Sequence, residues 1–214
     1  MRTFIANRLA LFGAAITAFV LLAVMVGPWL SPYSPTEADF LALLAPPSLA
    51  HPFGTDSFGR DVLTRILYGA RVSLSVSVAG VLMAALLGGS AGLISAYAGG
   101  WTSAILMRIA DLLFSFPSFV LALFLMVVLG FGVTNIAASI ALIYFPLFAR
   151  LSRNMALVVK EEPWVQAAQL MGQSTFSIIS REILPNIAAP LFVQIAIGIA
   201  FGICLLYTSD AADE

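Results

Sequence analysis

Charged side chains are scarce in this chain. Only 10% of its 214 residues are Asp, Glu, Lys or Arg, whereas 61% are hydrophobic, and the mean hydropathy is +1.02. A soluble globule of this composition would expose a large apolar surface, so the sequence predicts a membrane protein. The net charge is −1 and there is no polybasic run, which excludes a basic surface for nucleic acid.

Cysteine and histidine are each present once. The single cysteine, Cys204, lies in an apolar run and cannot form a disulfide within the chain. A metal site needs several cysteine or histidine ligands, and His51 is the one histidine. We therefore interpret both residues as incidental, and we expect no metal ion and no cofactor.

Enzyme motifs are also lacking. The chain has no G-x-x-x-x-G-K-[ST] sequence to cradle nucleotide phosphates, so it is not expected to be an ATPase. The stretch GGSAG matches the G-x-S-x-G pattern of serine hydrolases at Gly88, Ser90 and Gly92. That pattern needs a strand, a turn and a histidine base, whereas Ser90 falls within an apolar helical run. Helix packing is the better interpretation, and we expect no enzyme activity.

Long hydrophobic runs are abundant. A membrane helix needs about 20 apolar residues to cross the hydrocarbon core. Five runs come near this length, at residues 9–30, 73–97, 112–130, 135–149 and 187–207. The first is too long for the core of a signal peptide, and no small-x-small cleavage site precedes PWLSPYSP. The sequence therefore predicts an all-α, polytopic transmembrane helical bundle with five spans.

The positions of lysine and arginine predict the orientation, because positively charged flanks stay in the cytoplasm. With the N-terminus inside, seven basic residues are cytoplasmic: Arg2, Arg8, Arg108, Arg150, Arg153, Lys160 and Arg181. Three lie outside: Arg60, Arg65 and Arg71. We expect a multi-pass protein with a cytoplasmic N-terminus, an outer segment at 31–72 and a polar loop at 161–185 that faces the cytoplasm.

The outer segment contains two kinds of sequence. HPFGTDSFGRD is rich in turn-forming residues. In GRDVLTRILYGARVSL, one helical face carries Val62, Leu63, Ile66 and Leu67. On the other side Asp61 and Arg65 can reach water. The pattern fits a surface helix that leads into the second span and a solvated connector equally well.

Small residues recur at every fourth position of the second span, at Gly80, Ala84, Gly88, Gly92 and Ala96. Side chains four residues apart lie on the same face of a helix. Because small side chains let two membrane helices approach closely, we predict that this face packs against another helix and not against lipid.

The polar stretch at 161–185 reads EEPWVQAAQLMGQSTFSIISREILP. Two glutamates followed by proline favour a helix that begins at Pro163, and Gly172 supplies a left-handed residue to end it. The predicted helix covers residues 163–171, and its paired alanines leave room for another protein to approach. One face of it carries Trp164, Ala168 and Met171.

A second short helix is predicted from Ser174 to Leu184 and Pro185. Its apolar stripe carries Phe176, Ile179 and Ile183. Two short helices outside the spans form either a docking surface for another protein or an interfacial pair that rests on lipid headgroups. The residues alone favour neither alternative.

The stretch QAAQLMG followed by REILPN resembles the EAA loop in permease subunits of bacterial binding-protein-dependent ABC importers. HPFGTDSFGRDVLTRILYGARVSLSV, GGWTSAILMRIADLLFSFPSFVLAL and PLFARLSRNMALVVKEEPWVQAAQLMG are similar to the second permease of dipeptide, oligopeptide and nickel importers. The resemblance runs from residue 1 to about residue 203. Gln166 stands where the family has glutamate, and Glu182 occupies a position that is often apolar.

The resemblance implies that the loop docks onto an ATPase subunit. The residues implied in docking are Pro163, Trp164, Gln166, Ala167, Ala168, Gly172, Leu184 and Pro185. The implied partners are a homologous permease subunit, two cytoplasmic ATPase subunits, an external substrate-binding protein and the lipid of the bacterial cytoplasmic membrane. Closing of the ATPases would shift the spans between inward-open and outward-open arrangements.

The function implied by the resemblance is that of a peptide permease. The alternatives are a permease for nickel or another small solute, and a membrane scaffold or receptor without transport activity. The predicted spans contain no ionisable side chain, so Gln194 in the fifth span is the candidate pathway residue. The other interpretation of Gln194 is a hydrogen bond to a neighbouring helix.

Three regions follow from this interpretation. Residues 1–72 hold the N-terminal cytoplasmic end, the first span and the outer loop, and residues 73–203 form the permease core. The family has six spans, but its pattern stops after about Ile203, and CLLYTSDAADE matches nothing expected there. We therefore expect that residues 204–214 are not native sequence and that the chain as written does not support transport.

Overall fold

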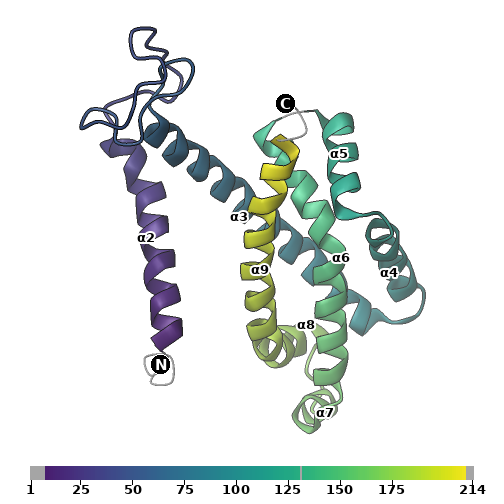
Figure 1. The fold of residues 1–214 in the computed structure, drawn as a ribbon. Coiled ribbons are helices and arrows are strands. Elements are labelled where there is room, and N and C mark those ends of the chain that lie inside the picture. Colours follow the sequence, from purple (N-terminus) through teal and green to yellow (C-terminus); the bar gives the residue numbers. More distant parts are fainter. Residues whose placement is uncertain (1–7, 131, 211–214) are drawn as a thin grey trace. The chain divides into compact units, whose positions relative to one another are not determined.

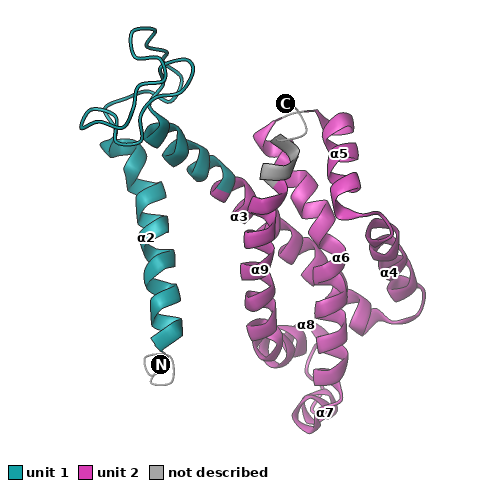
Figure 2. Ribbon diagram, viewed as in Figure 1, with its two compact units in different colours: residues 1–73 teal, residues 74–214 magenta. Residues whose placement is uncertain are grey.

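The computed structural model describes residues 8–130 and 132–210. The chain forms two compact units, residues 1–73 and residues 74–214 (Figure 2). Across the described residues all regular elements are helical, and one isolated antiparallel bridge joins Thr55 to Asp61. The prediction of an all-α fold is confirmed.

The first unit contains an apolar helix and an irregular loop. Helix α2 (Arg8–Leu30) is apolar around its whole circumference, as expected of a helix surrounded by lipid. The loop 31–61 follows it and leads into helix α3 (Val62–Ala98). Here α2 and α3 approach closely, because a Cβ added at Gly27 would lie 2.8 Å from the Leu67 side chain.

Helix α3 joins two elements that the sequence analysis separates. A surface helix or connector was expected near residues 59–74, followed by a span at 73–97. The structure has one helix that continues without a break from Val62 to Ala98. No proline interrupts this stretch, so nothing in it ends the helix before the glycine pair at 99 and 100.

The second unit is arranged around helix α6 (Val133–Lys160). Helices α4 (Gly100–Phe114), α5 (Ser118–Leu129) and α9 (Leu184–Asp210) pack against it (Figure 1). Pro146 is buried inside α6, which extends well beyond the span expected at 135–149. The extension comes from the stretch RLSRNMALVVK, whose charges end the apolar run but not the helix.

Three short segments connect α6 to α9. They are α7 (Pro163–Leu170), α8 (Thr175–Ile178) and a π-helical turn, η1 (Ile179–Ile183). The turn η1 passes directly into α9, so the described backbone is helical from Thr175 to Asp210.

Within residues 8–130 and 132–210, four helical stretches are long and apolar enough to cross a membrane, and α4 with α5 is a fifth if this bent pair is one span. The four are α2, α3, α6 and Thr175–Leu205. The pair α4 and α5 is bent by 94°. The span expected at 112–130 is therefore α5 with the last turn of α4, because Pro117 lacks the N–H group that a continuous helix needs.

The core of the second unit consists of two apolar clusters. The first cluster joins α3 to α6 and contains Val76, Val81, Ala84, Ala137, Ile140, Ala141 and Phe148. The second cluster joins the ends of these helices to the polar stretch and contains Ala96, Ala156, Val165, Ala168, Ile178, Ile183 and Ile187. Of the tail predicted at 204–214, residues 211–214 lie outside the described residues.

Candidate functional site

Helix α7 begins and ends where the sequence signals place its boundaries. Pro163 is its first residue. At the other end Gly172 has φ +76°, a conformation that favours glycine. The Gly172 N–H donates to the Gln169 carbonyl oxygen (3.0 Å). The Gln173 N–H donates to the Ala168 carbonyl oxygen (3.1 Å), which completes a Schellman motif.

The inner side of α7 belongs to the second cluster. Val165 and Ala168 are buried against the ends of α3 and α6. Of the residues expected on one face, Trp164 and Met171 are exposed, whereas Ala168 is buried and does not leave room for a partner. The buried face is centred between Val165 and Ala168, and Met171 lies beyond the last helical residue.

Gln166 stabilises the start of α7. Its Nε2 donates a hydrogen bond to the Glu161 carbonyl oxygen (3.1 Å). An ionised glutamate at this position would have no hydrogen to donate and could not make this contact. Glutamine therefore provides a bond to the chain's own backbone where a glutamate would place an exposed negative charge.

The second predicted helix differs from expectation in its length and in its buried face. The Ser177 N–H donates to Ser174 Oγ (3.3 Å), so Ser174 caps α8 as predicted. The helix does not end at Pro185 but continues through η1 into α9. Its buried stripe is formed by Ile178 and Ile183, whereas Phe176 is exposed.

Most of the residues expected to dock onto an ATPase lie on the surface. Those exposed on α7 and at its end are Pro163, Trp164, Gln166, Ala167 and Gly172. Leu184 and Pro185 are also exposed, but they belong to the first turn of α9. Ala168 is the exception, since its side chain is buried within this chain.

Two large apolar side chains on this surface were missed. Leu170 is 90% exposed at the end of α7, and Phe176 is 81% exposed on α8. Exposed groups of this size, outside the candidate spans or at their edge, are typical of a surface that another protein covers. The sequence does contain a signal for Leu170, because it is a large apolar residue in the polar stretch, two positions after the paired alanines.

All five small residues of α3 are buried, at Gly80, Ala84, Gly88, Gly92 and Ala96. A Cβ added at Gly80 would lie 2.8 Å from the Ala137 carbonyl oxygen, and one added at Gly88 would lie 2.5 Å from the Phe145 carbonyl oxygen. The Ser152 hydroxyl also donates to the Gly89 carbonyl oxygen (2.8 Å). The backbone of α6 therefore lies directly against this face of α3.

An ion pair joins α4 to α6. Arg150 Nη2 in α6 lies 2.6 Å from Asp111 Oδ1 in α4. The Arg150 guanidinium carbon also lies 4.5 Å from the centre of the Phe114 ring. Asp111 and Arg150 each fall one residue outside the runs expected at 112–130 and 135–149, so the sequence analysis did not pair them.

Gln194, the predicted pathway residue, lies in α9 and is half-buried. Its role in a pathway stays a prediction.

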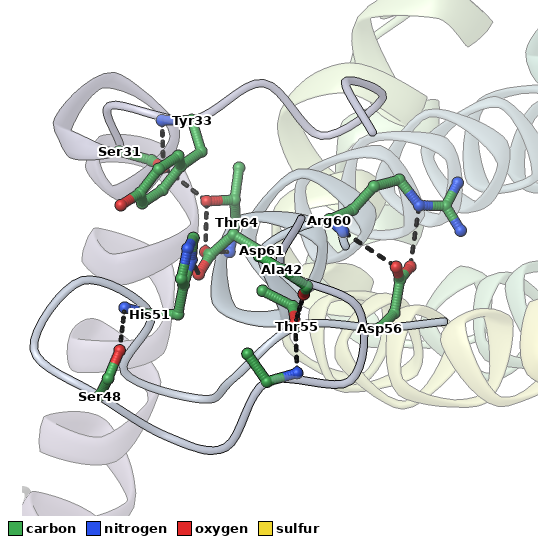
Figure 3. A network of polar contacts seen from close by, with 11 residues as sticks. Ser31, Tyr33, Ala42, Ser48, His51, Thr55, Asp56, Arg60, Asp61 and Thr64 are labelled. Carbon is green, nitrogen blue, oxygen red and sulfur yellow. Dashed lines mark hydrogen bonds and ion pairs between the residues drawn. The ribbon is translucent and has the colours of Figure 1, made fainter. Parts of the chain in front are cut away.

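A polar network holds the loop between α2 and α3 (Figure 3). Asp61 is buried, and its Oδ1 lies 3.0 Å from His51 Nδ1. Its Oδ2 accepts hydrogen bonds from the N–H (2.8 Å) and the hydroxyl (2.6 Å) of Thr64. The Thr64 hydroxyl lies 2.5 Å from Ser31 Oγ. The interpretations of His51 as incidental and of Asp61 as reaching water are therefore wrong.

A second carboxylate, Asp56, organises the adjacent turn. Its Oδ1 accepts hydrogen bonds from the N–H groups of Phe58 (2.8 Å) and Arg60 (3.0 Å). Its Oδ2 pairs with Arg60 Nε (2.8 Å) and with Arg65. Burial alone raises the pKa of Asp56, but these hydrogen bonds outweigh burial and lower the pKa to about 2.

The balance of effects on Asp61 is similar. Burial raises its pKa, whereas hydrogen bonds from the Thr64 hydroxyl and N–H and the interaction with His51 lower it. The net shift is downward, so the network is formed by the ionised carboxylate.

Two family models match this chain. Residues 86–207 match the binding-protein-dependent transport system inner membrane component, and residues 1–47 match the N-terminal TM domain of oligopeptide transport permease C.

Curated relatives are similar over most of this chain. It is 40% identical over 201 residues to the dipeptide transport system permease protein of Alkalihalophilus pseudofirmus, which covers 94% of this chain and 65% of the relative. It is 38% identical over 202 residues to the probable D,D-dipeptide transport system permease protein of Escherichia coli, covering 94% and 68%. It is 36% identical over 189 residues to the glutathione transport system permease protein of Pectobacterium atrosepticum, covering 86% and 63%. The chain thus spans about two thirds of the length of these relatives.

Proposed function

Because the chain belongs to the family of inner membrane components of binding-protein-dependent transport systems, we propose that it is a permease subunit of an ATP-driven importer of short peptides. The names of its relatives refer to dipeptide, D,D-dipeptide and glutathione transport, which supports a peptide cargo. The chain itself forms part of a multi-pass protein of the inner membrane.

The partners follow from this role. A homologous permease subunit completes the translocation pathway, two cytoplasmic ATPase subunits hydrolyse ATP, and an external binding protein delivers the peptide. The N-terminus and the loop 161–185 lie in the cytoplasm, and the loop 31–61 lies outside. The distribution of lysine and arginine supports this orientation.

The single observation that carries the proposal is that α7 is buried on one side against α3 and α6 and exposed on the other. Its outer side exposes Trp164, Ala167 and Leu170, whereas Val165 and Ala168 fix its inner side to the ends of α3 and α6. An ATPase that binds the outer side and then moves would carry α7 and the ends of both spans with it. The spans would shift between inward-open and outward-open arrangements, with no covalent change in the peptide.

The test is replacement of the most exposed apolar side chain of α7. In the complete importer, Leu170→Asp is expected to lower co-purification of the ATPase subunits at least tenfold, because it puts a charge into the covered surface. Folding should be unaffected, since Leu170 is 90% exposed within this chain.

The matched control is Leu41→Asp, which alters a leucine that is 99% exposed in the loop 31–61. It should leave ATPase co-purification at the level of the unaltered chain. Normal ATPase co-purification with Leu170→Asp would show that α7 is not the docking element. Failure of the unaltered chain to bind any ATPase subunit would contradict its role as a permease subunit.

A further inference from the structure

Helix α6 is joined to α7 by a short link. The last residue of α6 is Lys160, and only Glu161 and Glu162 separate it from the first residue of α7. The Glu161 N–H donates to the Val158 carbonyl oxygen (3.2 Å). The Glu162 N–H donates to the Val159 carbonyl oxygen (3.1 Å). These bonds have the 3₁₀ pattern, whose geometry is poorer than that of α-helical bonds, so a force on α7 acts first on a weak end of α6.

The Lys160 side chain contacts the end of α3. Its Nζ lies 5.0 Å from the centre of the Tyr97 ring, and Tyr97 is the last residue but one of α3. An ammonium group over an aromatic ring at this distance is attracted by the negative face of the ring. The ion pairs found among residues 8–130 and 132–210 do not include Lys160. Its charge is therefore directed at the Tyr97 ring and not at a carboxylate.

Tyr97 also lies beside α7. It packs against the second cluster, which contains Val165 and Ala168 from that helix. Gln169 of α7 faces the Tyr97 hydroxyl, which is buried and forms no hydrogen bond of ordinary geometry in the described part of the chain. One aromatic side chain thus lies where the ends of α3 and α6 meet the inner side of α7.

We propose that the contact between Tyr97 and Lys160 holds the last turn of α6 on α3, so that a displacement of α7 moves both helices instead of unwinding this turn. Tyr97 and Lys160 are positioning residues, because they act on the connection between α7 and the spans. The inference rests on the proposed function for the source of the force, which is an ATPase subunit bound to α7. It adds the side chains that pass the movement to α3, a helix to which α7 is not directly linked along the chain.

The close packing of α3 on α6 does not reach this turn. The closest backbone contact toward the end of α3 is at Gly92, which lies against Arg153 and the residues before it, about two turns ahead of Lys160. Beyond that region the second cluster joins the helices, and its buried member from α6 is Ala156, about one turn ahead of Lys160. The final residue of α6 therefore depends on Tyr97 for its contact with α3.

Hydrogen exchange of the backbone amides measures how often the last turn of α6 opens. Tyr97→Leu removes the ring, whereas Tyr97→Phe keeps the ring and removes only the hydroxyl. We expect segment 157–162 to exchange about threefold to thirtyfold faster in Tyr97→Leu than in the unaltered chain, the range that a cation–π contact supplies. Tyr97→Phe should exchange like the unaltered chain, and segment 140–150 should be unaffected in both variants. If Tyr97→Leu does not fold, Tyr97→Met takes its place, because methionine fills irregular space.

A second pair of variants changes the cation. Lys160→Met should speed exchange of segment 157–162, and Lys160→Arg, which keeps the charge, should not. Lys160→Met also removes a favourable charge at the C-terminal end of the helix. The double variant Tyr97→Leu with Lys160→Met isolates the contact itself, since the second change should then add less than it does alone. Fully additive effects would overturn the proposal.

Transmission of the movement is measured in the complex of this chain with the homologous permease subunit and the ATPase subunits. Trapping the ATPases with ATP and orthovanadate should change the exchange of α7 and of residues 93–98 at the end of α3. In Tyr97→Leu the change at α7 should persist, while the change at the end of α3 should become at least threefold smaller. A role in stability alone would leave the ratio of the two changes as it is in the unaltered chain.

The proposal is overturned if Tyr97→Leu and Tyr97→Phe exchange alike in segment 157–162, or if faster exchange extends over the whole of α6. An undiminished response of α3 to ATP and orthovanadate in Tyr97→Leu also overturns it. Failure of the proposed function is a separate outcome. If the unaltered chain binds no ATPase subunit, its role as a permease subunit is contradicted, while exchange in the chain by itself still decides whether Tyr97 and Lys160 hold the turn.

Discussion

Two neighbouring glycines of α3 differ sharply in their surroundings. A Cβ at Gly88 would lie 2.5 Å from the Phe145 carbonyl oxygen, whereas a Cβ at Gly89 would meet nothing within 4 Å. Gly88→Ala should therefore force α3 and α6 apart and lower the free energy of unfolding by about 1–3 kcal/mol. Gly89→Ala should have no such cost, and it gains up to about 1 kcal/mol of helix propensity.

The measurement is thermal unfolding of both variants in the same detergent, read by the fraction of chain that stays monodisperse. The midpoint should fall for Gly88→Ala and be maintained or rise for Gly89→Ala. Equal midpoints would mean that the small-residue face of α3 is not in contact with α6.

Gly172 is constrained by its backbone conformation and not by space. Its φ is +76°, and a Cβ there would meet nothing within 4 Å. Gly172→Ala should cost about 1–2 kcal/mol through the left-handed conformation, whereas Gly172→Asn should cost less, because asparagine adopts this conformation more readily. ATPase co-purification with the complete importer should be weakened by alanine more than by asparagine. The reverse order would contradict a role for this turn in docking.

The roles of single residues were predictable where they depend on neighbouring residues in the sequence. Pro163 and Gly172 limit the conformation of their own backbone, so the sequence correctly predicted the start and the end of α7. His51 and Asp61 are ten residues apart, and their contact depends on how the loop between them folds back. The same reasoning explains Gln166, whose bond to Glu161 needs the geometry of the helix start.

At the scale of elements, the loop 31–61 depends on ionised carboxylates. The pKa of Asp56 is lowered to about 2 from an ordinary value of 3.8, and that of Asp61 is also lowered. A carboxylate with a lowered pKa in the folded state stabilises that state above its ordinary pKa, and this stabilisation is lost as the pH falls through its folded value. The loop should therefore hold its structure down to about pH 4 and lose it progressively toward pH 2.

Limited proteolysis with pepsin, which cleaves in this pH range, measures the opening of the loop. Asp56→Asn should make the loop cleavable at pH 4, because the neutral amide cannot form the ion pairs with Arg60 and Arg65. Glu37→Gln, at an exposed position of the same loop, should leave the pH dependence unchanged. Equal cleavage of the two variants would contradict this account of Asp56.

Element types were predicted well and element boundaries less well. Apolar runs mark the part of a helix that suits lipid, whereas backbone hydrogen bonding continues through charged residues and, in α6, past Pro146. This is why α3 begins at Val62 and α6 ends at Lys160, each well outside its apolar run. Because the predicted boundaries followed the apolar runs, Asp111 and Arg150 were not considered together. The bend between α4 and α5 was not predicted either, although Pro117 indicates a break in the helix.

At the scale of the whole chain, the bent pair of α4 and α5 decides the topology. If the pair crosses the membrane once, three spans separate residue 37 from residue 173, and the two positions lie on opposite sides. If the pair enters and leaves on the same side, they share a side. We expect alkaline phosphatase, which is active only outside the cytoplasm, to be active when fused at residue 37 and inactive at residue 173.

A third fusion, at Gly130, separates the two topologies directly. Activity there means that α5 has reached the outer side, as five spans require, and inactivity means that the pair is re-entrant.

The expectation that residues 204–214 are not native stays a prediction, and sequencing of the gene tests it.

The unbroken run of helix from α8 through η1 into α9 has a mechanical consequence. The polar stretch 161–185 is not one continuous helix. The turn at Gly172 separates α7 from α8, so the two helices can change their relative angle there. On its α9 side it behaves as a rod, because Thr175–Leu205 is continuous helix and is, at about 1.5 Å per residue, roughly 45 Å long. A pull on α8 would reach the far side of the membrane along the backbone itself. Bending would concentrate at the π-helical turn and at Pro185 and Pro190, where the hydrogen-bond ladder is interrupted.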